Sequence, residues 1–97
     1  MLKYTQKGGV YMTFEGAHIK VQGVEFAIVI VKSYILNIPS TRESTRDSFK
    51  DIFGDIPIIL MCQDFKGIPT FHGRPDIVKY LANVDYRKIP WERYTIN

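Results

Sequence analysis

The sequence predicts an α+β fold, close to the α/β class, in which one mixed sheet carries two helices. A chain of 97 residues has the length of a single small domain, and its 45% hydrophobic content is enough to build a core. A buried strand, an amphipathic helix and a second buried strand follow one another, and a hairpin comes next. We therefore expect about four to five strands and two helices in the order β-β-β-α-β-β-α.

Two short strands open the domain in this prediction. They lie at residues 11–14 and 19–22, and residues 15–17 (EGA) between them have the composition of a turn. Ile19 and Val21 alternate with polar residues, which is typical of a strand with one face in water.

The third strand and the first helix have stronger patterns. Residues 24–32 (VEFAIVIVK) are rich in β-branched residues and apolar on both faces, as in a central strand covered from both sides. An irregular apolar connection is expected over residues 33–39. A helix is predicted to begin after Pro39, with Ser40 and Glu43 spaced as in a capping box, and Gly54 ends it.

A second buried strand and a hairpin follow this helix in the prediction. Residues 58–62 (IILMC) form a buried strand, and the crossover from residues 24–32 predicts that the two strands are parallel. After a turn at residues 64–67 the chain returns over residues 68–72. Pro69 lacks an N–H donor, so this returning strand is expected at a sheet edge.

A second helix and a tail complete the predicted domain. Pro75 suits the first position of a helix and Asp76 suits the positive end of its dipole. The tail, residues 86–97, is expected to pack onto the body. The expected core consists of apolar residues from the strands and helices: Phe26, Ile28, Ile30, Phe49, Ile52, Phe53, Ile59, Leu60, Ile77 and Leu81.

The domain is expected to span residues 12–97, with residues 1–11 as a disordered extension. Residues 7–9 (KGG) can be encoded by AAA GGA GGT, which contains a bacterial ribosome-binding sequence just before the codon for Met12. We therefore expect a bacterial protein whose translation starts at Met12. Without the two lysines of the extension, eleven basic and ten acidic side chains remain. The net charge then falls from +3 to +1, which weakens the indication of an anionic partner.

Cysteine usage and hydropathy indicate the compartment. Cys62 is the only cysteine, so the chain forms no internal disulfide, and we expect a reducing environment. The N-terminus lacks the apolar segment of a signal peptide. The longest apolar run, residues 26–31, is far shorter than the roughly 20 residues that span a bilayer. We expect a cytoplasmic protein without membrane contact.

Part of the chain resembles a known family. Residues 54–60 (GDIPIIL), the turn at residues 65–67, Gly73 and the helix at residues 77–81 resemble the C-terminal half of thioredoxin-like proteins. In that family a strand, a helix, an Ile-Pro pair, a strand, a tight turn, a strand, a glycine and a helix follow in this order. The resemblance covers roughly residues 24–84.

The resemblance implies one backbone feature and excludes one activity. The Ile-Pro bond of that family is cis, which implies a cis-proline at Pro57. The family's Cys-x-x-Cys redox pair is absent here, so the resemblance implies no oxidoreductase chemistry. Cys62 has Met61 and Gln63 as neighbours rather than cations, and we expect it to act as a small hydrophobic side chain.

Two histidines are the remaining residues of catalytic type. His18 and His72 do not have the spacing of metal ligands, so neither a metal nor a cofactor is expected. His72 and Arg74 flank the start of the second helix, where free N–H groups and a guanidinium are suited to hold a phosphate or carboxylate. The alternative is a solvated arginine beside an ordinary edge-strand histidine.

The tail interleaves cations with aromatic rings, at Arg87, Lys88, Trp91, Arg93 and Tyr94. One interpretation buries the rings on the sheet and leaves the cations in water. A second makes the tail a protein interface anchored by Arg87, Trp91, Arg93 and Tyr94. A third adds Arg74 to the tail and binds single-stranded nucleic acid by stacking and charge.

The sequence favours a non-catalytic binding function, because no catalytic constellation has a local signature. We expect protein–protein contact or homodimerisation, through the tail or through an edge strand such as residues 68–72 or the N-terminal strands. A nucleic-acid-binding module that uses the tail and a small anion-binding domain at the second helix are the alternatives.

Overall fold

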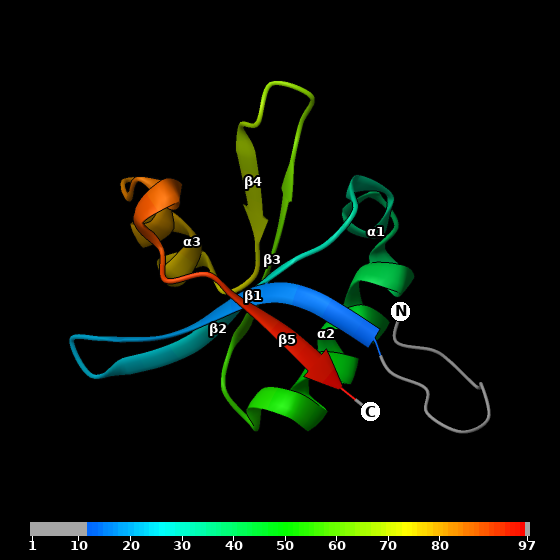
Figure 1. Cartoon of the computed structure of the whole chain (residues 1–97), viewed down its shortest axis with the longest axis horizontal. Coiled ribbons are helices and arrows are strands. Elements are labelled where there is room, and N and C mark those ends of the chain that lie inside the picture. The colour runs from blue at the N-terminus through cyan, green and yellow to red at the C-terminus, as the bar shows by residue number, and fades with distance from the viewer. Residues whose placement is uncertain (1–11, 97) are drawn as a thin grey trace.

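A computed structural model of the chain describes residues 12–96. It contains one five-stranded mixed sheet with the strand order β4-β3-β2-β1-β5 and three α-helices (Figure 1). The predicted α+β class and the mixed sheet are confirmed, whereas the proposed extension at residues 1–11 lies outside the described residues. The elements are β1 (Met12–Val21), β2 (Val24–Ile30), α1 (Ser33–Asn37), α2 (Pro39–Phe53), β3 (Ile58–Gln63), β4 (Pro69–His72), α3 (Pro75–Leu81), a 3-10 turn η1 (Tyr86–Lys88) and β5 (Glu92–Ile96).

The crossover between β2 and β3 has the predicted direction. The two strands run parallel, with Ala27 opposite Ile58 and Ile30 opposite Met61, and the other neighbouring pairs in the sheet are antiparallel. Within residues 12–96, β4 pairs only with β3 and forms one edge of the sheet, as Pro69 predicted.

Both faces of the sheet are covered, because neighbouring residues of a strand point to opposite faces. On β3, Ile58 and Leu60 pack with α1 and α2, whereas Ile59 and Met61 pack with α3 and with Ile89 after η1. The predicted core residues belong to these two clusters, although Ile30, Ile52 and Phe53 are only half-buried. This two-sided burial explains why β2 and β3 are apolar throughout.

The predicted pair of N-terminal strands is wrong, because β1 is a single strand that runs through residues 15–17. Gly16 lies within the strand, opposite Val29. A Cβ at Gly16 would lie 2.7 Å from the carbonyl oxygen of Ile28. The glycine therefore permits close backbone approach between β1 and β2 rather than a turn.

The connection before α2 also differs from the prediction. Residues 33–39 were expected to be irregular, but they contain α1. The capping box is wrong as well: α2 begins at Pro39, Ile38 holds the N-cap position, and no side chain caps the helix. Gly54 ends α2 as predicted, with φ +88° and its N–H donated to the carbonyl of Lys50.

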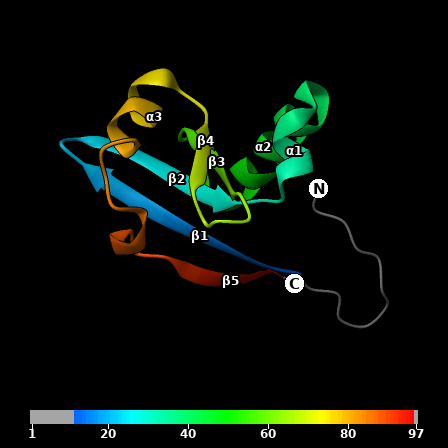
Figure 2. The ribbon, with the colours of Figure 1, turned by 90° about the horizontal axis from the view of Figure 1, so that it is seen from above.

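Ile89 and Trp91 of the tail lie in the apolar cluster on the α3 face, and the end of the tail joins the sheet. β5 pairs antiparallel with β1, with Phe14 opposite Tyr94 (Figure 2). The observed order is therefore β-β-α-α-β-β-α-β, with a 3-10 turn before the last strand. The peptide bond before Pro57 is trans, so the cis-proline that the resemblance implied is wrong.

Candidate interaction surface

His72 and Arg74, the predicted anion-binding pair, have different partners in the structure. The Nδ1 atom of His72 lies 2.7 Å from Nη2 of Arg46, on α2. Arg74 forms two hydrogen bonds of 2.8 Å with the carboxylate of Asp76 instead. The two side chains that were expected to hold an anion together therefore each have another side-chain partner.

Arg46 explains why His72 is held in this way. Its Nε donates to the carbonyl oxygen of Ile58 at 3.0 Å, its Nη2 donates to that of His72 at 3.1 Å, and its Nη1 pairs with Glu43 at 2.5 Å. The Ile58 carbonyl lies beyond the last pair of the β3–β4 ladder, Leu60 with His72. Arg46 thus supplies the donor that β4 no longer offers, because the chain turns away at Gly73.

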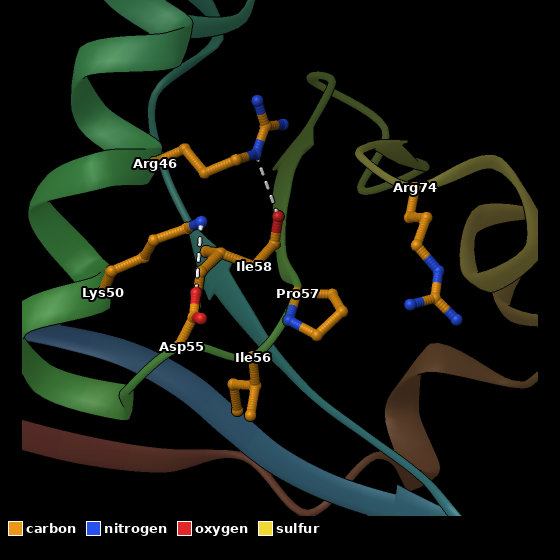
Figure 3. Close-up of a pocket in the computed structure, with 7 residues that line it drawn as sticks. All are labelled: Arg46, Lys50, Asp55, Ile56, Pro57, Ile58 and Arg74. Carbon is orange, nitrogen blue, oxygen red and sulfur yellow. Dashed lines mark hydrogen bonds and ion pairs between the residues drawn. The ribbon is translucent and has the colours of Figure 1, made fainter.

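A shallow hollow of about 400 Å³ lies beside Arg46, between the C-terminal half of α2 and the start of β3. Lys50, Asp55 and Arg74 also line it (Figure 3). Lys50 faces Asp55 at 3.8 Å, and the Arg74 side chain extends away from the Arg46 guanidinium. Since each cation has a carboxylate partner, the hollow has little excess positive charge with which to hold an anion.

The four predicted interface residues of the tail take two different roles. Trp91 and Tyr94 are half-buried, and Trp91 Nε1 donates to the carbonyl of Tyr86 at 2.9 Å. Tyr94 stacks on Phe14 with ring centroids 5.0 Å apart. Arg87 and Arg93 are exposed and pair with Asp85 and Glu15 respectively, so the rings pack and the cations face water.

Neither Cys62 nor the histidines form a recognisable reactive centre. Burial, with a smaller contribution from Asp64, raises the pKa of the Cys62 thiol, which makes it a weaker nucleophile at neutral pH. Within residues 12–96 no group of three or more His, Cys, Asp or Glu side chains is placed to hold a metal ion. His18 instead pairs with Glu25 across the β1–β2 hairpin at 2.5 Å.

The β3–β4 hairpin carries two exposed large apolar side chains. Phe65, in the turn, is 94% exposed, and Ile68, just before β4, is 57% exposed. Asp64 holds the turn, because its carboxylate accepts hydrogen bonds from the N–H groups of Lys66 and Ile68. The sequence predicted this turn and named residues 68–72 as an edge strand suited to pairing, but it did not single out Phe65.

Beside the hairpin an open groove of about 500 Å³ separates β4 from α3 and the segment after it. Its walls are mainly apolar. They are formed by Ile68, Pro69, Thr70 and Phe71 on one side and by Val78, Leu81, Ala82, Val84 and Tyr86 on the other.

β4 also presents main-chain groups at this groove. The N–H of Asp64 donates to the carbonyl of Ile68, so the even-numbered residues of β4 direct their backbone groups toward β3. The N–H and C=O of Phe71 and the C=O of Pro69 consequently face outward. An apolar groove and an unpaired strand edge therefore lie side by side, a combination that no local sequence motif announces.

Comparison of the chain with protein-family models, with curated proteins and with solved structures finds no match. Among the helices of residues 12–96, none has the length and apolar character needed to cross a membrane.

Proposed function

We propose that this protein is a non-catalytic binding domain that takes an extended, apolar segment of another protein along β4. One observation carries the proposal: the edge of β4, which no other described strand pairs with, borders an apolar groove, and the exposed Ile68 lies at both. An apolar patch of this kind on a small domain marks an interaction surface.

The strand edge and the groove make separate contributions to recognition. A segment that adds to β4 bonds to Phe71 through its main chain and alternates its side chains between the two sheet faces. Those on the α3 side meet the groove wall formed by Val78, Leu81 and Ala82. We therefore expect apolar residues at every second position of the bound segment.

Proline limits the length of this strand addition. Pro69 has no N–H, so β4 offers one outward donor and two outward acceptors. Most of the affinity must then come from side chains in the groove, which favours a short motif with bulky apolar anchors over a long strand.

Selection from a displayed library of unstructured random peptides tests the proposal on the full chain. We expect selected peptides to share alternating apolar residues. Replacement of the exposed Ile68 by glutamate should weaken their binding by about tenfold or more, because a desolvated charge replaces an apolar contact at the groove. A second groove variant, Ala82→Glu, should have the same effect.

Ile38→Glu is the matched control. Ile38 is 49% exposed and lies between α1 and α2, outside the residues that line the groove. The same substitution there should leave peptide binding unchanged. The proposal fails if no peptide is selected, or if Ile68→Glu and Ala82→Glu bind the selected peptides as the unaltered chain does.

Nucleic-acid binding by the tail receives less support from the geometry. Arg74, Arg87 and Arg93 each have a carboxylate partner. Trp91 is half-buried and its indole N–H is already bonded, so it does not present a free ring for base stacking.

A further inference from the structure

β5 forms the second edge of the sheet, and its outer side has no partner within residues 12–96 (Figure 2). Ala27 donates its N–H to Pro57, so the odd-numbered residues of β2 direct their backbone groups toward β3. The direction of the backbone groups alternates along each strand, and the registers of the paired strands carry this alternation from β2 through β1 to β5. Tyr94 therefore bonds to Phe14, and Arg93 and Thr95 direct their N–H and C=O groups outward.

This edge lacks the protection that β4 has. β4 has four residues and starts with a proline, whereas the five residues of β5 include neither proline nor glycine. Tyr94 and Ile96 are half-buried on the α2 face, where they extend the core cluster to the very edge of the sheet. An edge strand without proline that carries an apolar strip is a natural surface for strand pairing.

We propose that β5 pairs antiparallel with β5 of a second copy of this chain, about a two-fold axis at Tyr94. In this register Arg93 lies opposite Thr95 of the partner subunit, and the outward groups of these two residues form four main-chain hydrogen bonds. The sheets of the two protomers then form one continuous sheet.

The side chains favour this register over its neighbours. An axis at Arg93 would place two guanidinium groups opposite each other, which is unfavourable. An axis at Thr95 would leave Glu92 and Arg93 without a partner among the described residues, whereas the axis at Tyr94 pairs every residue of β5. It also places Tyr94 beside Tyr94 of the partner subunit. Tyr94 already stacks on Phe14 and meets Phe53 edge-on, with 5.2 Å between the Phe53 and Tyr94 ring centroids. The second tyrosine enlarges this aromatic group.

Sedimentation of the full chain over a concentration series tests the proposal. Two variants place opposite charges at the exposed position 95. We expect a dimer. Thr95→Lys places one lysine opposite Arg93 in each of the two Arg93–Thr95 pairs of the dimer and should raise the dimer Kd by about tenfold. Thr95→Glu creates opposite-charge pairs at the same two places and should lower the Kd.

Thr95→Pro removes an outward N–H while the bonds of β5 to β1 are kept, so this variant should be a folded monomer. A monomeric unaltered chain would overturn the proposal, as would a dimer that tolerates Thr95→Pro or responds equally to lysine and glutamate. Ile68→Glu should leave the mass unchanged, so failure of this proposal is distinguishable from failure of the peptide site.

Discussion

Arg46 joins three separate parts of the chain through one guanidinium. It bonds to Glu43 on its own helix, to the start of β3 and to the end of β4, and its side chain is only 13% exposed. Because it lies within a run of mixed charges, the sequence presents it as one more solvated cation. Its structural role depends on two carbonyls that only the folded sheet brings within reach.

This arrangement favours the neutral form of His72. Burial lowers its pKa below the usual 6.5, and the positive charges of Arg42 and Arg46 lower it further. With Nδ1 accepting from Arg46, the proton of the neutral ring is on Nε2.

The free energy of unfolding should therefore fall as the pH drops below 6.5, because the unfolded chain takes up a proton that the folded one resists. Urea unfolding between pH 7.5 and pH 5 measures this, because these pH values lie about one unit or more to either side of the unperturbed pKa. His72→Gln keeps an acceptor for Arg46 and does not titrate, so its stability should vary less over this range. An equal pH dependence in both proteins would contradict the prediction.

Thr45 is the opposite case, a buried polar group without a partner. Its side chain is 1% exposed, and no hydrogen bond to its hydroxyl is formed within the described residues. Thr45→Val has the same shape and removes the hydroxyl, so it should raise the free energy of unfolding by about 1 kcal/mol. Chemical denaturation measures the change. Thr41→Val, at a half-buried position one turn earlier on α2, is the control and should change stability less.

Among the elements, β1 shows how a glycine can mislead. Glycine within a polar stretch is typical of a turn, yet Gly16 lies at the point where a side chain would collide with the β2 backbone. Gly16→Ala should therefore destabilise the protein by about 1–3 kcal/mol, since the obstacle is a main-chain oxygen that cannot move aside by itself. Thermal unfolding, with the exposed Thr13→Ala on the same strand as control, checks this. A change no larger than that of the control would contradict it.

β5 was missed for a related reason. The tail carries charges and rings at irregular spacing, and its five strand residues are too few for a period of two to be distinctive. Its pairing with β1 joins segments from opposite ends of the chain, and no local pattern reports such a contact. The tail was predicted to pack, but the strand, and with it the second sheet edge, followed only from the structure.

For the whole molecule, four aromatic rings connect the two ends of the chain to α2. Phe14 stacks on Tyr94 and meets Phe49 edge-on at 4.8 Å, while Phe53 contacts both Phe14 and Tyr94. These contacts pack β1, β5 and α2 against one another.

A double-mutant cycle measures this closure. Phe14→Leu and Tyr94→Leu should be coupled by about 1 kcal/mol in the free energy of unfolding, because either change alone breaks the stack. Phe14→Leu combined with Tyr80→Leu is the control. Tyr80 is 45% exposed and lies on α3, on the other face of the sheet, so these two changes should be additive. Additivity in both cycles would mean that the aromatic group contributes no specific interaction.

Features that depend on neighbouring residues were predictable without the structure. The apolar runs at residues 24–32 and 58–62 predicted two central strands, the crossover predicted their parallel direction, and Pro69 predicted an edge. Gly54 predicted the end of α2. Each of these follows from side-chain periodicity or from a restriction on one residue's backbone, and both are local properties.

Tertiary structure alone decided which distant groups meet. It brought Arg46 to His72 and to the sheet, made one strand of the predicted two at the N-terminus and turned the end of the tail into β5. It also placed the apolar groove beside an unpaired strand edge, the basis of the proposed function. These outcomes depend on the packing of segments far apart in the chain, where burial and close contact override the preference of any single stretch.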